Sequence, residues 1–167
     1  MLKPFVPLET AKMQARSAYR EALERLKKHC LSQNETQFYE RAVKVLDRTP
    51  IYWEKIGFLS CGRTKKYKNG RNEIVYEIIM NSNFLYSEDA PDFIKYTLIH
   101  ELAHVIASVY DGTLEHNETF QNFDRILGGD GARFAPFRDP IISVRVDTSM
   151  RAICAPRRNL SARSSRR

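Results

Sequence analysis

One apolar stretch constrains this chain more than any other feature: FIKYTLIHELAHVIASVY, at residues 93–110. The residues around HELAH are apolar, so a helix here is expected to be buried in the core. Two histidines and a glutamate interrupt the stretch, which leaves no run long enough to span a membrane. The pattern predicts a helix over 91–110 that starts at Pro91 and stops at Asp111-Gly112.

HELAH places three chemically active side chains in a fixed relation. His100 and His104 are four residues apart, so both imidazoles lie on one helix face and can reach a single Zn²⁺. Glu101 follows His100 directly and can reach a water on the metal without being a ligand. This is the position of the base in zinc hydrolases. The spacing therefore predicts a catalytic zinc site on a buried helix.

A catalytic zinc needs a third protein ligand and one open position. His116 is the first candidate, because the chain can turn after Gly112 and bring this residue back under the helix. Glu115 and Glu118 remain alternatives, since carboxylates also bind zinc. His29 is expected to be a structural residue at a helix end.

The rest of the chain predicts an α+β fold, in which N-terminal helices and a small antiparallel sheet pack on the buried helix. Asn69-Gly70 separates two strand-like runs and indicates a hairpin. Thr49-Pro50 ends the second helix, and Gly128-Gly129 the last one. The expected elements are helices over 8–29, 36–48 and 117–127, a strand over 73–80 and a possible late strand over 141–146.

The net charge of +7 is unevenly distributed, because residues 151–167 hold six arginines and no acid. More cations gather at the hairpin turn. Such groups bind phosphates without reading sequence, although a solvated turn and a disordered solubility tail are the alternatives. Three distant cysteines argue against disulfides and against a cysteine zinc ribbon. The predicted nucleic-acid contacts are Lys65, Lys66, Lys68, Arg71, Arg157 and Arg158.

The run TLIHELAHVIASVYDGTLEHNETFQNFDRILGG resembles the core of the SprT-like zinc metallopeptidases, which include Spartan. Trp53 ahead of a strand, SCGRT at 60–64 and MNSNFL at 80–85 agree with it, and Asn117 stands where that family often has glycine. The resemblance implies a zincin-like domain over 1–146 and a basic tail over 147–167. It also implies His100, His104 and His116 as zinc ligands and Glu101 as the catalytic acid/base.

The function expected from these observations is that of a zinc-dependent endopeptidase, which hydrolyses peptide bonds of DNA-associated or DNA-crosslinked proteins inside the cell (cytoplasm, nucleoid or nucleus). A peptide substrate is expected to add to the sheet beside the strand at 73–80. Two alternatives stay open. One is a zinc peptidase that acts on regulatory proteins without DNA, and the other is a non-catalytic nucleic-acid-binding module with structural zinc.

Overall fold

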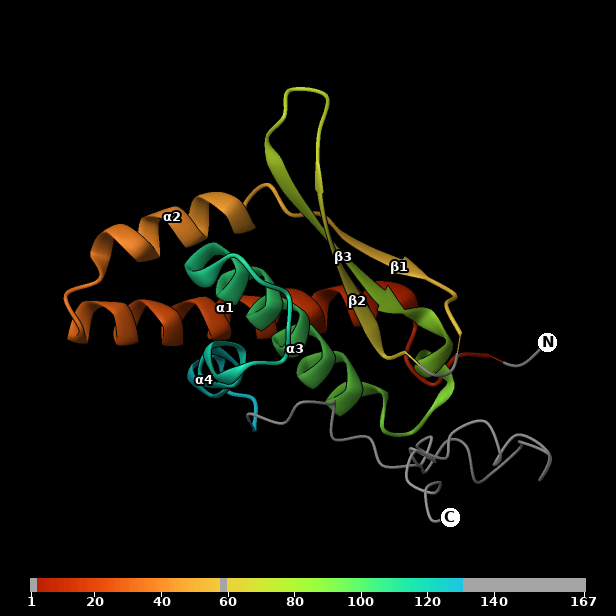
Figure 1. Cartoon of the computed structure of the whole chain (residues 1–167). Helices are drawn as coiled ribbons and strands as arrows, with labels where there is room; N and C mark the ends of the chain where they lie inside the picture. Colours follow the sequence, from red (N-terminus) through yellow and green to blue (C-terminus); the bar gives the residue numbers. More distant parts are fainter. Residues whose placement is uncertain (1–2, 58–59, 131–167) are drawn as a thin grey trace, which may run out of the picture. The chain divides into compact units, whose positions relative to one another are not determined.

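The computed structural model describes residues 3–57 and 60–130 (Figure 1). Over these residues the chain forms an α+β fold with four α-helices, a three-stranded sheet and one 3₁₀ helix. In chain order the elements are α1 (Leu8–Ser32), α2 (Thr36–Leu46), β1 (Ile51–Glu54), β2 (Gly62–Lys68), β3 (Ile74–Asn81), η1 (Ser82–Tyr86), α3 (Ala90–Asp111) and α4 (Glu118–Leu127).

The centre of the fold is α3, which packs against α1, α2, α4 and the sheet (Figure 1). Most of its residues are buried, as the apolar sequence predicts. The face of α1 that packs here carries mainly small side chains, at Ala11, Ala15, Ala18 and Ala22, which allow the two helices to approach closely. None of the described helices is long and apolar enough to cross a membrane.

Both predicted glycine stops on the helices are confirmed. Gly112 follows α3 with φ of 87°, and Gly128 follows α4 with φ of 106°. This left-handed conformation suits glycine because a side chain would clash with the backbone. The stop at Gly112 frees the chain to turn, which places the next loop back over α3.

The prediction of an antiparallel sheet is wrong in one respect, because the sheet is mixed with strand order β1-β3-β2. The β2–β3 hairpin is antiparallel, but β1 runs parallel to β3. A hairpin turn is a local signal, whereas β1 pairs with a strand that does not follow it directly in the chain. Trp53 lies within β1 and precedes β2 in the chain.

Two further expectations about the hairpin need correction. Since β3 is the central strand, a peptide cannot add along its full length, and the free edge of the hairpin is β2. The turn over 69–73 forms where Asn69-Gly70 predicts it, but its left-handed residue is Asn72, with φ of 61°. The Asn69 side chain accepts hydrogen bonds from the backbone N–H groups of Arg71 and Glu73 and so shapes this wider turn.

Some predictions fall outside the described residues. These are the strand over 141–146, the domain boundary at 146 and the arginines Arg157 and Arg158.

Candidate metal centre

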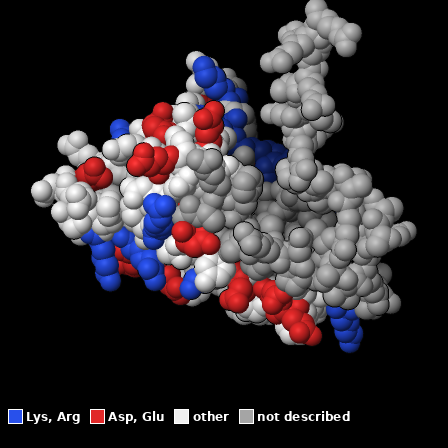
Figure 2. Space-filling view, turned by 60° about the horizontal axis from the view of Figure 1, so that its bottom comes forward, with Lys and Arg blue, Asp and Glu red and all other residues white. Residues whose placement is uncertain are grey.

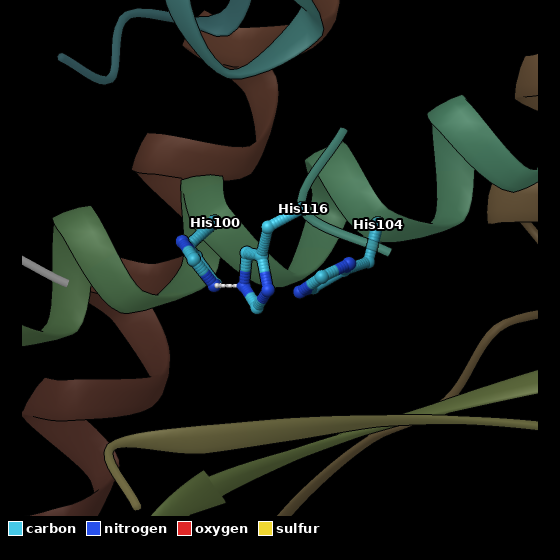
Figure 3. A group of neighbouring side chains, drawn as sticks. All are labelled: His100, His104 and His116. Atoms are coloured by element: carbon cyan, nitrogen blue, oxygen red, sulfur yellow. Dashed lines mark hydrogen bonds between the residues drawn. The ribbon is translucent and has the colours of Figure 1, made fainter. Parts of the chain in front are cut away.

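Three histidines meet on the side of α3 that faces the sheet (Figure 3). His100 and His104 project from α3, and His116 comes from the loop between α3 and α4. One ring nitrogen from each residue lies within 4.8 Å of the others. Nε2 of His116 and Nε2 of His100 are 3.0 Å apart. The structure thus brings together the three residues that the sequence predicts as ligands.

This geometry fits a metal ion. Four tetrahedral ligands with bonds of about 2.0 Å hold neighbouring nitrogens about 3.3 Å apart, close to the 3.0 Å between His100 and His116. Imidazole nitrogen suits Zn²⁺ and also copper, iron and nickel, so the group can hold a metal without defining which one. The rival carboxylates Glu115 and Glu118 are exposed and are not part of the group.

Electrostatics favour the neutral, metal-binding form of the two helical histidines. Burial, reinforced by the charge of His116, lowers the pKa of His100 to about 4, although Asp130 opposes the shift. Burial also lowers the pKa of His104 to about 3, with smaller effects from His100 and His116. A neutral imidazole has a lone pair for a metal. Both residues are therefore ready to bind a cation at neutral pH.

The loop that carries His116 is held in place by Asp111 and Asn117. The Asn117 amide donates to Oδ2 of Asp111 over 2.9 Å, and its Oδ1 accepts from the backbone N–H of Phe120 over 2.9 Å. Asn117 is thus the N-cap of α4 and also a link to the end of α3. Burial alone would raise the pKa of Asp111, but hydrogen bonds from Thr113, Asn117 and Thr119 lower it.

Phe120 packs against the three imidazoles. Its ring centroid lies 4.4 Å from that of His104 and 4.8 Å from those of His100 and His116, and its side chain is fully buried. The sequence shows Phe120 only as part of the apolar face of α4. This contact shields the histidine group on the side of α4 and fixes the ring orientations by packing.

Glu101 is buried on α3, with 5% of its surface exposed. Burial raises the pKa of Glu101 to about 7, against the opposing effects of Thr64 and Arg63. Oγ1 of Thr64, on β2, donates to Oε2 of Glu101 over 2.6 Å. A carboxyl group with a pKa near neutrality can take up and release a proton under working conditions.

Thr64 and Gly62 are site residues that sequence reasoning missed. A β-carbon at Gly62 would lie 2.8 Å from Oε1 of Glu101 and 2.7 Å from Cγ2 of Thr97. Only glycine lets β2 pass this close to α3. The segment SCGRT contains both residues, but their contact with Glu101 depends on how β2 crosses α3. The local sequence pattern does not indicate how β2 crosses α3.

The predicted nucleic-acid residues of the hairpin are not equivalent. Lys66 turns toward the helices and donates to the carbonyl of Gly112 over 2.5 Å, at the C-terminal end of α3. Lys65 lies 4.0 Å from Glu77 on β3. Lys68 and Arg71 are exposed near the turn. The structure therefore leaves Lys68 and Arg71 as the more accessible cations of this set.

No family model, curated protein or solved structure significantly matches this chain. The resemblance to SprT-like peptidases therefore rests on the sequence motif and its spacing alone.

Proposed function

We propose that this chain is a zinc-dependent endopeptidase of the SprT-like, zincin-like type, and that its substrates are proteins associated with or crosslinked to DNA. The observation that carries the peptidase proposal is the buried Glu101 carboxyl group on the helix that also supplies two of three clustered imidazoles. A site that only holds a structural metal has no need of a base in this position.

His100, His104 and His116 would hold the zinc. When bound, zinc supplies Lewis acidity toward the scissile carbonyl and toward water. Glu101 takes a proton from the attacking water and later delivers it to the leaving amine. The hydrogen bond from Thr64 keeps the Glu101 carboxyl group oriented during both transfers. The raised pKa of Glu101, about 7, supports both roles, and a bound cation would lower it.

The free edge of β2 supports the proposal that the substrate peptide binds beside this strand. Among the described residues β2 pairs only with β3, so its other edge can accept an extended peptide. Thr64 lies on this strand and contacts Glu101, so a peptide added there would pass close to the base. N-methylation of alternate peptide bonds in a cleavable peptide tests this step. Equal cleavage of methylated and unmethylated peptides would contradict it.

The DNA part of the proposal is supported by charge alone. Lys68 and Arg71 are exposed at the hairpin turn, and residues 151–167 hold six arginines and no acid. Cations of this kind bind phosphates irrespective of sequence.

The test is cleavage of casein and self-cleavage by the purified full chain, with and without single-stranded DNA, with bound zinc quantified. Glu101→Gln should abolish cleavage and keep about one zinc per chain, as expected for a base that is not a ligand. Glu115→Gln, a matched change at an exposed acid, should cleave like the wild type. Cleavage without any DNA effect would favour a peptidase of regulatory proteins. Zinc binding without cleavage would favour a structural-zinc module.

A further inference from the structure

Charge is separated along this chain. Residues 3–130 hold eighteen Lys and Arg and eighteen Asp and Glu, but sixteen of the cations lie in 3–71 and eleven of the acids in 72–130. On the face shown in Figure 2, acidic and basic side chains are interspersed. A binding site for an anion is therefore expected where segments of the basic half meet. Those segments are α1, α2, β1 and β2.

One such meeting point is a pocket of about 570 Å³ between α1, the end of α2 and β1. Its volume is in the range of small-molecule sites, roughly 300–1,000 Å³. It is separate from the histidine group, since no histidine lines it. Its lining includes Lys12, Arg16, Tyr19, Arg20, Asp47 and Trp53.

The α1 wall of this pocket is strongly basic. Lys12, Arg16 and Arg20 follow at intervals of four residues, so they lie on one helix face about 6 Å apart along the axis. Lys12 pairs with Glu9, but in the described part of the chain Arg16 and Arg20 form no ion pair. Asp47 is the single acid in the lining. Two guanidinium groups thus face the pocket with unneutralised charge, and guanidinium matches phosphate in geometry.

The part of the lining that comes from β1 is aromatic and apolar. Trp53 and Ile51 come from β1, and both are partly exposed. Tryptophan beside arginine is the combination with which proteins hold single nucleic-acid strands, because a base stacks on the ring while the cations bind its phosphates. Every base has a flat face, so such a site tolerates any sequence.

We propose that this pocket binds a nucleotide unit, with the base against Trp53 and the phosphate on Arg16 and Arg20. The unit can come from a single-stranded nucleic acid or from a free nucleotide. The proposal adds a binding site to the proposed function and needs no peptidase activity. It rests on the proposed function only where the strand is taken to carry the substrate protein.

Trp53 is the only tryptophan in the chain, so its fluorescence reports directly on the pocket. The probes are an oligothymidylate of about eight nucleotides, within the usual site size of single-strand-binding grooves, together with thymidine monophosphate and inorganic phosphate. We expect saturable quenching by the oligonucleotide at low salt. Equally tight quenching by the monophosphate would identify a free nucleotide as the source. Much weaker quenching by the monophosphate would identify a strand.

Matched variants separate a site from diffuse charge. Arg16→Ala with Arg20→Ala should weaken oligonucleotide binding at least about tenfold, because two charge-assisted contacts are lost. Lys27→Ala with Lys28→Ala removes the same charge from exposed positions of α1 and should change affinity less than about threefold. Trp53→Phe, followed by the anisotropy of a labelled oligonucleotide, should keep partial binding because phenylalanine also stacks.

The proposal is overturned if neither the oligothymidylate nor thymidine monophosphate quenches Trp53, or if the two double variants lose affinity equally while both stay folded by circular dichroism. Casein cleavage by the same preparations, without nucleic acid, tests the peptidase separately. A chain that cleaves casein but shows no quenching would contradict only the proposal of a nucleotide-binding pocket. Quenching of Trp53 without cleavage of casein would contradict only the proposed peptidase activity.

Discussion

The histidine group on α3 and the basic turn of the β2–β3 hairpin are both visible in the sequence. The two sets of side chains differ in how far their arrangement in the structure follows from that sequence. At the histidine group the three predicted side chains converge on one point. At the hairpin, Lys66 is engaged by Gly112 while Lys68 stays exposed. Spacing within one helix determines where side chains point. A count of charges does not tell which of them already have partners.

The largest expected effect is at the histidine group. His116→Ala should weaken zinc binding about 100- to 4,000-fold, because one of three protein ligands accounts for about 3–5 kcal/mol of a binding free energy near 10–16 kcal/mol. Competition against a fluorescent chelator measures this change. His29→Ala, the matched change on α1, should leave zinc affinity unaltered. Undiminished affinity in His116→Ala would show that His116 is not a ligand.

Two glycines at opposite ends of the hairpin give the next contrast. Gly62→Ala should destabilise the fold by about 1–3 kcal/mol, the usual cost of overpacking, because its β-carbon would meet Glu101 and Thr97. Gly70→Ala should change stability by less than about 1 kcal/mol, since nothing lies within 4 Å of a β-carbon there. Urea unfolding of both variants measures the difference. Similar midpoints would mean that β2 does not pass closely over α3.

The loop between α3 and α4 tests whether His116 depends on its support. Asp111→Ala removes one of the two acceptors of the Asn117 amide, the other being Thr113, and keeps all three histidines. We expect zinc affinity to fall about tenfold, the lower range for changes behind a metal ligand. Glu115→Ala, at an exposed site in the same loop, is the control for chelator competition. Equal affinities in both variants would show that the loop holds His116 without Asp111.

Much of the fold could be predicted, because its signals are local. The apolar run predicts α3, Gly112 and Gly128 predict two helix ends, and the Asn69-Gly70 pair predicts the hairpin. Contacts between distant segments could not be predicted in the same way. The parallel pairing of β1 with β3 is one example.

At the histidine site, too, local features could be predicted from the sequence and contacts between separate elements could not. Its helical ligands follow from their four-residue spacing, and His116 from the turn after Gly112. The hydrogen bond from Thr64 to Glu101 and the packing of Phe120 on the imidazoles join separate elements. No spacing in the sequence encodes either contact, because each depends on how two elements cross in space.

The smallest expected effect separates two lysines of β2. Lys66→Ala should destabilise the fold by about 0.3–1 kcal/mol, as for other cations at helix C-termini, because its ammonium group donates to the Gly112 carbonyl. Lys68→Ala should leave stability within about 0.5 kcal/mol of the wild type. The order reverses for oligonucleotide affinity at low salt, which Lys68→Ala should lower more, since only Lys68 is exposed for phosphate contact. Thermal melts and anisotropy titrations of the two variants measure both quantities. The same rank order in both experiments would remove the distinction between an engaged and an accessible lysine.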